Sequence, residues 1–495
     1  MRRVSTALLG VTMAFSVSGL AGAAQVPTGI SHQAAIDRQI LNAAGQTSGL
    51  VHTAPGYSMA EGVAAAESVG LRTGTHYDAI DVFVAYGSSS SFRALSAAEE
   101  ARYIEWNAPL TFFTDSSHKA TQGQNVLDGE ATLPDGTIVD GTGVGVAVVD
   151  SGIDGTHPDL ASRMGGNVKI VCSTPQFVAI GATGGFSECL GPKQAVPLAD
   201  TDTPSGGGHG THVAGIVAGT GAASAGKYHG AAPGATLYGV SVGTAIAVEN
   251  GLDGLAWVLE NHDQVTPAIK VVSNSWGSGY SAYDKDNAPF HKATWLLQEA
   301  LINDGVTVVF AAGNASGNGS APTTTAECLL PMEGLVCVAN YDDRNSGTRS
   351  GAIASSSSRG QKTDSTTWPD ISAPGTSIVS TCRATLPVCW ANTGQITDPP
   401  NSYSTLSGTS MAAPHVSGII AQLYQVDPNL TPAEIENVIE DTAYKFTFGS
   451  AYESDPYNPD NTSSFEKGHG LIDVLAAVRA LLEPLVTTAQ PPTGP

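Results

Sequence analysis

Basic residues are scarce in this sequence of 495 residues. Lysine and arginine together number 22 against 45 aspartates and glutamates, which gives a formal net charge of −23. A surface this acidic excludes charge-driven binding to nucleic acid or to anionic membrane surfaces. The excess of acidic residues is typical of the solvated surface of a secreted protein.

Long apolar runs are scarce too. Near the N-terminus, the basic start Met1 to Arg3 precedes an apolar stretch from Ala7 to Leu20 and the small residues Ala21 to Ala24. These three parts predict a signal peptide over residues 1–24 and secretion, directly or through a periplasm, with twin-arginine export as the alternative route. No later run reaches 18 apolar residues, so the mature protein is not expected to span a membrane.

Cysteine is also rare, and the spacing of the six cysteines matches no zinc-binding pattern. Export to an oxidising compartment favours disulfides instead. Sequence proximity favours one of several possible pairings. It joins Cys172 with Cys189, Cys328 with Cys337, and Cys382 with Cys389.

The segment Leu406 to His415 contains a candidate nucleophile. It reads LSGTSMAAPH and places Ser410 at a glycine-permitted turn that opens a helix. Serine is a weak nucleophile near its free pKa. It therefore needs a base, a group that orients the base, and hydrogen-bond donors for the oxyanion.

Two histidines three residues apart, His209 and His212, offer the base. They lie where the glycine-rich stretch GHGTHVAG becomes an apolar helix. An isolated histidine or aspartate at a loop end is as often a cap or a packing group. The spacing alone does not choose between the two.

Two apolar runs end in polar side chains that could complete the site. Val144 to Val149 precedes Asp150, and Val306 to Gly313 precedes Asn314. Such runs predict buried parallel strands, and ligands of α/β sheets bind at the carboxyl ends of the strands. Asp150 is thus a candidate to orient the base. Asn314 is a candidate oxyanion donor, together with the backbone N–H of Ser410.

The motifs DSGIDGTHPDL, GHGTHVAG, AAGN and GTSMAAPH, in this order, resemble those of the subtilisin family of serine proteases over residues 140–480. The resemblance implies a secreted serine endopeptidase with an Asp150, His209 and Ser410 triad. His209 is preferred because the family places its catalytic imidazole first in this motif, which makes His212 structural. Asn314 becomes the implied oxyanion donor.

The resemblance also implies a pocket for the residue before the scissile bond, the P1 residue. Its two backbone walls are Ser275-Trp276-Gly277 and Ala311-Ala312-Gly313, whose small side chains leave room for a large apolar or aromatic group. The resemblance does not fix the position of Glu327, so no acidic pocket floor is assigned. Kexin-like relatives, which prefer basic residues, carry Arg and Cys where His212 and Val213 stand here, and this disfavours that alternative.

Two segments depart from the family pattern. Gly219 to Lys227 lacks the Asn-rich insertion that forms the high-affinity calcium loop of the best-known members, although Asp159 matches one of its ligands. A structural calcium therefore has no assignable site, and the chemistry itself needs no cofactor. Gly243 to Asn250 does not match the edge strand that binds more distant substrate residues.

The composition divides the chain into four parts. After the signal peptide, residues 25–113 resemble the pro-region that subtilisin relatives use as a folding chaperone and transient inhibitor, with a small accessory domain as the alternative. We expect a strand at Ala79 to Ala85 and a helix at Leu95 to Arg102 in this part, and a cut after Phe113. Residues 114–484 are the predicted catalytic domain, and residues 485–495 are a predicted Pro-rich, disordered tail.

Strands and helices alternate in the predicted catalytic domain. Strands are expected at Val144–Val149, Ala235–Val242, Ile269–Asn274 and from Val306, and helices at Thr211–Gly219, Gly251–His262, Thr294–Asn303 and Gly470–Leu482. This rhythm predicts an α/β fold with a mostly parallel central sheet and helices on both faces, preceded by a small α+β pro-domain.

Two other functions fit the same residues. A catalytically silent binding protein is disfavoured because every group that the mechanism needs is present. An esterase or peptide ligase would pass the acyl group to another acceptor, whereas hydrolysis is the default in water. The expected partners of a monomeric enzyme are protein or peptide substrates and its own pro-region.

Overall fold

The structure is a computed structural model. It describes residues 33–107, 111–112, 120–173, 175–180, 184–189, 191–202, 207–243, 248–278, 293–344, 346–383, 386, 397–398, 401–455 and 460–488. The predicted signal peptide, Phe113, Cys389 and residues 489–495 lie outside this set.

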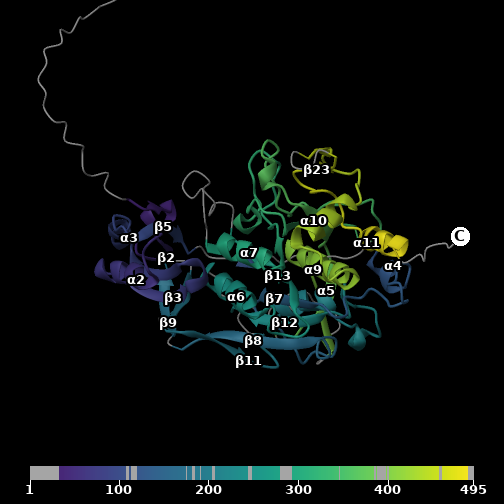
Figure 1. Ribbon diagram of the computed structural model, residues 1–495, viewed down its shortest axis with the longest axis horizontal. Helices are drawn as coiled ribbons and strands as arrows, with labels where there is room; N and C mark the ends of the chain where they lie inside the picture. The colour runs from purple at the N-terminus through teal and green to yellow at the C-terminus, as the bar shows by residue number, and fades with distance from the viewer. Residues whose placement is uncertain are drawn as a thin grey trace, which may run out of the picture.

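A mostly parallel sheet forms the centre of the larger body (Figure 1). Its strands, in spatial order, are β11 (Lys193–Pro197), β8 (Met164–Cys172), β12 (Thr236–Ser241), β7 (Gly145–Asp150), β13 (Ile269–Asn274), β15 (Thr307–Ala311), β16 (Leu335–Asp342) and β17 (Ala352–Ile353), with β18 (Ile371–Pro374) also paired to β16. Only β11 and β17 pair in the antiparallel sense.

Helices cover both faces of this sheet. One face carries α4 (Gly123–Leu127), α5 (His209–Ala218), α9 (Thr409–Val426), α10 (Pro432–Asp441) and α11 (Val474–Thr488), and the other carries α6 (Val248–Asn261) and α7 (Ala293–Asn303). Val146 and Val148 of β7 pack on the first face, and Ala147 and Val149 on the second. Burial on both faces explains the continuous apolar run of β7. The predicted fold class is confirmed.

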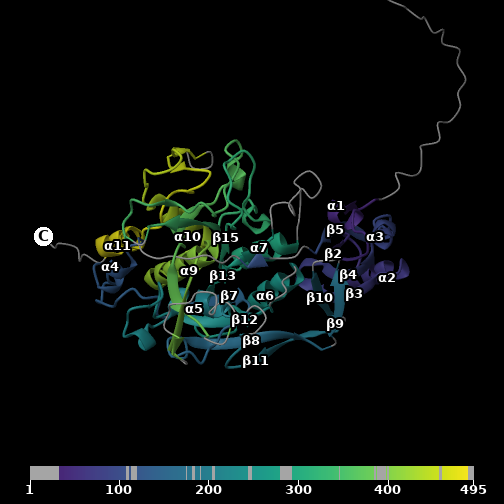
Figure 2. The same cartoon turned by 180° about the vertical axis from the view of Figure 1, so that it is seen from behind.

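A smaller α+β unit precedes this body. Its sheet contains β1 (Ala35–Ile36), β5 (Ala101–Trp106), β2 (Gln46–Thr53), β4 (Val82–Ser88) and β3 (Arg72–Tyr77), in that order, and its helices are α1 (Arg38–Leu41), α2 (Met59–Ser68) and α3 (Ser89–Leu95). One face of the sheet packs in its own core around Phe83 and Phe92. On the other face, Leu50, Val84 and Tyr86 belong to the same apolar cluster as residues of α6 and α7. Both views show this sheet beside the two helices (Figures 1 and 2).

Two expectations for this unit are corrected. The predicted helix at Leu95 to Arg102 is wrong, because α3 ends at Leu95 and Ala101 begins β5. The strand forms because its backbone bonds to both β1 and β2, which outweighs the helix propensity of the local Ala and Glu residues. The predicted strand from Ala79 begins only at Val82, after a short 3-10 turn.

Short strand pairs complete the fold. They are β9 (Pro175–Ile180) with β10 (Gly184–Cys189), β6 (Thr111–Phe112) with β14 (Trp276–Gly277), β19 (Ile378–Thr381) with β21 (Asn401–Leu406) and β20 (Thr397–Asp398), and β22 (Glu453–Ser454) with β23 (Thr462–Ser463). Helix α11 runs to Thr488 and so extends into the predicted tail. The first pair of adjacent prolines in the tail begins later, at Pro491. Within the described ranges, no helix has the length and apolar character to cross a bilayer.

Candidate active site

The carboxyl end of β7 positions Asp150. The carboxylate accepts a hydrogen bond from the backbone N–H of Ser151 at 2.6 Å and is 1% exposed. The chain then turns at Gly152, whose φ of 128° favours glycine and where a Cβ atom would lie 2.3 Å from the carbonyl oxygen of Thr201. The strand and this turn together fix the carboxylate at the edge of the sheet.

His209 is the first residue of α5 and lies against Asp150. Its Nδ1 lies 2.8 Å from Oδ1 and 3.0 Å from Oδ2 of the carboxylate, and the imidazole is 1% exposed. The next residue must be small, because a Cβ atom on Gly210 would lie 2.3 Å from the carbonyl oxygen of Gly152. The carboxylate holds the proton on Nδ1, which leaves Nε2 with its lone pair.

His212 has a different environment. Its Nε2 lies 3.0 Å from the Ser404 carbonyl oxygen and 3.2 Å from that of Ile378, so this nitrogen donates. Burial lowers the pKa of His212 to about 3, and the ring is neutral at physiological pH. These contacts give His212 a structural place between α5 and the strands β19 and β21, while His209 has the carboxylate partner.

Ser410 is the second residue of α9 and is fully buried. Its Oγ donates to the carbonyl oxygen of Ser275 at 3.1 Å, and the Ser275 hydroxyl donates back to the Ser410 carbonyl oxygen at 2.9 Å. The indole N–H of Trp276 donates to the Val149 carbonyl oxygen at 2.9 Å. The start of α9 is therefore bonded to the segment that follows β13, and that segment is in turn bonded to β7.

Asn314 follows β15 and also touches the start of α9. Its Oδ1 accepts hydrogen bonds from the backbone N–H of Thr409 at 3.1 Å and from the Thr409 hydroxyl at 3.3 Å. Its Nδ2 is buried and has no hydrogen-bond partner among the described residues. A buried, unpaired N–H donor costs free energy unless a ligand uses it. The contact with Thr409, which is next in sequence to Ser410, thus holds the amide at the start of α9 with its Nδ2 donor available.

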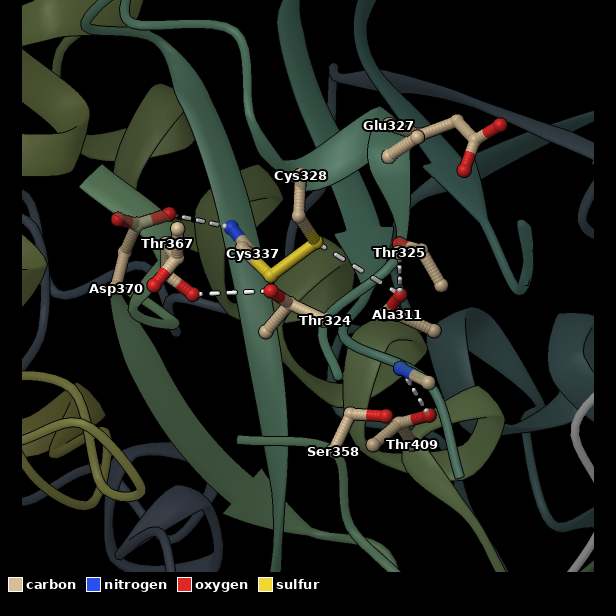
Figure 3. The surroundings of a disulfide bond; sticks show 12 residues. Ala311, Thr324, Thr325, Glu327, Cys328, Cys337, Ser358, Thr367, Asp370 and Thr409 are labelled. Carbon is tan, nitrogen blue, oxygen red and sulfur yellow. Dashed lines mark hydrogen bonds between the residues drawn. A yellow bond between two sulfur atoms is a disulfide. The ribbon is translucent and has the colours of Figure 1, made fainter. Parts of the chain in front are cut away.

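Thr325 lies next to both predicted walls of the P1 pocket. Its backbone N–H donates to the Ala312 carbonyl oxygen at 3.0 Å. Its hydroxyl donates to the Ala311 carbonyl oxygen at 3.2 Å (Figure 3). Cβ atoms built on Gly277 and Gly313 would lie 2.7 and 3.0 Å from the Thr325 methyl group. The threonine therefore fills the space where the glycines of the two walls approach each other.

Glu327 lies beside the same wall, which the sequence did not reveal. Its carboxylate, on a residue 3% exposed, accepts the backbone N–H of Ser278 at 2.8 Å and the Ser278 hydroxyl at 2.9 Å. A Cβ atom on Gly277 would lie 3.0 Å from this carboxylate. The position of this carboxylate depends on its contact with Ser278, which is 49 positions away, and no local sequence pattern predicts such a contact.

Two of the predicted disulfides are formed. The S–S distance is 2.01 Å for Cys172–Cys189 and 2.13 Å for Cys328–Cys337. The sulfur of Cys328 lies 3.8 Å from the Ala311 carbonyl oxygen, so the second bridge lies directly behind the pocket wall (Figure 3). Cys382 is also disulfide-bonded, and its predicted partner Cys389 is outside the described residues.

Asp159, the residue that matches a family calcium ligand, is fully buried. Its Oδ1 accepts from the backbone N–H of Ala223 at 2.7 Å, and its Oδ2 accepts from the Tyr403 hydroxyl at 2.8 Å. Each carboxylate oxygen thus has a protein donor. In this chain Asp159 holds the shortened loop by hydrogen bonds.

A separate group of acidic residues could in principle hold a cation. One carboxylate oxygen from each of Asp370, Glu436 and Glu440 lies within 4.8 Å of the others. Burial, and secondarily the Glu440 charge, raises the pKa of Asp370 to about 8, and burial also raises the pKa of Glu436 and Glu440. These carboxyl groups therefore bind protons more readily than free ones, which lowers their mutual repulsion.

Comparisons of this chain with protein families and with single proteins all find subtilases. A model of the Subtilase family matches residues 141–470. Serine protease AprX of Bacillus subtilis (strain 168) is 32% identical over 362 residues, which is 71% of each chain. Subtilisin E of the same strain is 29% identical, over 68% of this chain and 66% of that protein.

Fervidolysin of Fervidobacterium pennivorans is 31% identical over 69% of this chain but only 41% of its own length, so the chain matches less than half of it. Its crystal structure is described as that of a keratinolytic enzyme related to subtilisin. The TM-score is 0.60 at 21% sequence identity, with 91% of this chain and 63% of that chain covered. This structural likeness supports the fold.

Proposed function

The chain belongs to the subtilase family and is a serine-type endopeptidase, and from this premise we propose that it is secreted as a zymogen that cuts itself. The signal peptide expected over residues 1–24 supports export. The disulfides Cys172–Cys189 and Cys328–Cys337 are in keeping with an oxidising compartment. We propose that the mature enzyme acts as a monomer.

Ser410 is the proposed nucleophile. Its Oγ adds to the scissile carbonyl carbon while its proton passes to Nε2 of His209. His209 then gives this proton to the leaving amine, the C–N bond breaks, and the acyl group stays on Ser410. Water attacks the ester with His209 as base, and the acid product leaves with Ser410 restored.

One observation carries this proposal: the 2.8 Å contact between Nδ1 of His209 and Asp150. It holds the tautomer in which Nε2 accepts the serine proton. In the structure the Ser410 hydroxyl donates to Ser275. In the proposed reacting complex it donates to Nε2 instead, since catalytic hydrogen bonds often form only when substrate binds.

Asn314 is the proposed side-chain donor to the oxyanion. Its Nδ2 is buried without a partner in the described part of the chain, while its Oδ1 is held by Thr409. The amide therefore does not reorganise as the charge develops. The backbone N–H of Ser410, at the start of α9, is the proposed second donor.

We propose a preference for large apolar or aromatic P1 residues. The small residues of the walls at 275–277 and 311–313 leave room for such a side chain. The Glu327 carboxylate beside Gly277 could instead favour a basic residue, but it already accepts hydrogen bonds from Ser278. A cleavage profile on a peptide library separates the two, because an Arg or Lys preference would overturn the proposal.

Residues 25–113 are the proposed pro-region. The strand β6 pairs with β14 in the antiparallel sense, with Phe112 opposite Trp276 and Thr111 opposite Gly277. The segment just before the predicted cut therefore lies along one wall of the P1 pocket as an extended substrate would. This pairing supports a cut after Phe113, the next residue.

The proposal is tested on the full chain with Ser410→Ala. The variant is expected to accumulate as an unprocessed precursor without activity on casein, while the wild-type enzyme starts at Thr114. Ser417→Ala is the matched control, because Ser417 is buried in the same helix and its hydroxyl donates to the carbonyl oxygen of Ala413 in its own helix. A processed, active Ser410→Ala protein would overturn the nucleophile, and an N-terminus beyond Gly123 would overturn the cut site.

A further inference from the structure

A disulfide-linked arm leaves the edge of the central sheet and reaches the N-terminal unit. We define the arm as the described residues 164–173, 175–180, 184–189 and 191–197, which contain β8, β9, β10 and β11. Both views show β9 close to β3 of the N-terminal sheet (Figures 1 and 2). A Cβ atom on Gly74 of β3 would lie 2.9 Å from the Cys189 carbonyl oxygen, so the backbones of the arm and the N-terminal unit touch. The Cys172–Cys189 bridge closes this part of the arm.

Four residues beyond Cys189, the arm places Lys193 on two carboxylates of α6. Its ammonium group donates to Asp253 at 2.5 Å and to Glu249 at still closer range. Glu249 and Asp253 are one helical turn apart, so they lie on the same face of α6. They are only 3% and 8% exposed. We call Lys193, Glu249 and Asp253 the junction.

The N-terminal unit supplies the other hydrogen bonds of the junction. The Tyr86 hydroxyl donates to Glu249 at 2.8 Å, and the Tyr77 hydroxyl donates to Asp253 at 3.0 Å. Tyr77 and Tyr86 are themselves buried. The junction therefore joins three parts of the chain that are distant in sequence: the N-terminal unit, the arm and α6.

The physical need for Lys193 differs between two states of the zymogen. While the N-terminal unit is docked, two carboxylates are held side by side away from water, where mutual repulsion and lost hydration are costly without a cation. When that unit leaves, this face of α6 opens to solvent, which hydrates and screens the same carboxylates. Lys193 therefore stabilises the docked state more than the released state.

We propose that the arm, through Lys193, retains the cleaved pro-region and so delays the appearance of protease activity. The proposal rests on the proposed zymogen function. The partner of the arm is the chain's own segment 25–113 after the cut. Removal of the ammonium group leaves two buried carboxylates without their cation, which penalises the docked state and speeds release.

Two events in the full chain test this. Gel electrophoresis follows the cut, and a small peptide substrate follows the appearance of activity, with gel filtration to show whether the cut pro-region still co-elutes. In Lys193→Met we expect the delay between cut and activity to shorten at least about fivefold, since a buried pair has lost one partner. The kcat/KM per titrated active site, once activation is complete, should equal that of the wild type.

Lys193→Arg should keep most of the delay, because it keeps the cation. Lys169→Met on β8 is the matched control for a lost positive charge in the arm and should keep the full delay. If Lys193→Met fails to fold, Tyr86→Phe decides, since it removes one donor to Glu249 and should also shorten the delay.

The outcomes separate this inference from the proposed function. An unchanged delay in Lys193→Met, or in Tyr86→Phe where it must decide, overturns the retaining role alone. The same holds if wild-type activity appears at the moment of the cut. Full activity of the uncut wild-type chain would instead overturn the zymogen proposal.

Discussion

Two buried clusters of charged residues carry the two proposals made for this molecule. In the first, Asp150 and His209 come from one body, the end of β7 and the start of α5, and each is 1% exposed. In the second, Lys193 contacts Glu249 and Asp253 of α6, and the N-terminal unit covers these contacts and adds a hydrogen bond from Tyr86 to Glu249. A permanent cluster can orient a catalytic base, whereas a cluster completed by a removable part can control when that part leaves.

The largest effect should come from a break in the first cluster. Asp150→Asn keeps the shape but presents an amide to His209, which favours the wrong tautomer. We expect kcat to fall about 10⁴-fold. Asp253→Asn in the second cluster is the contrast, with kcat of the activated enzyme within about twofold of the wild type. A loss of only tenfold in Asp150→Asn would contradict the assigned role.

Asn314→Ala should have the next largest effect, and this effect should fall on kcat. We expect kcat to fall about 100-fold or more with KM nearly unchanged, because the amide donates to the oxyanion and not to the ground-state carbonyl. Steady-state kinetics on one peptide measures both constants. A comparable rise in KM would mean that Asn314 binds substrate instead.

A smaller effect is a dependence on pH that has opposite signs for His212 and for the second cluster. Burial lowers the pKa of His212 to about 3 from an ordinary value of 6.5. Below pH 6.5 the unfolded chain therefore binds a proton that the folded chain refuses, and the stability contributed by neutral His212 is lost as the pH falls. In the second cluster burial raises the pKa of Asp253 to about 6, so a fall in pH towards 6 favours the docked state instead.

The measurement is urea unfolding of Ser410→Ala with and without His212→Gln. The stability advantage of His212 over glutamine should shrink by about 1.6 kcal/mol between pH 6.5 and pH 5. An advantage that is the same at both pH values would show that His212 does not resist protonation.

The residues proposed for the catalytic centre could be selected from the sequence because they follow the ends of apolar strands. Continuous apolar runs such as Val144 to Val149 occur in strands buried on both faces, and the polar residues that follow them meet at one edge. His209 could be preferred over His212 only through the family motif. The structure supplies a physical difference, since His209 contacts a carboxylate and His212 contacts two carbonyl oxygens.

The arm was not predicted because its strands carry a weak signal. The strand from Met164 to Cys172 begins with two glycines after the methionine and mixes polar with apolar residues, so it has no clean alternation. The position of the Glu327 carboxylate depends on its contact with the distant Ser278. Where a helix was wrongly predicted over Leu95 to Arg102, the strand β5 begins instead because it pairs with β2. Such tertiary contacts override local propensity and cannot be derived from a single sequence.

Covalent labelling tests the central claim most directly. The activated enzyme is treated with phenylmethylsulfonyl fluoride, and the labelled peptide is identified by mass spectrometry while casein hydrolysis is followed. We predict one label per chain, on Ser410, with activity lost in proportion to labelling, and much slower labelling of Asp150→Asn. Complete inhibition with the label on another residue would contradict the assignment of Ser410 as the nucleophile.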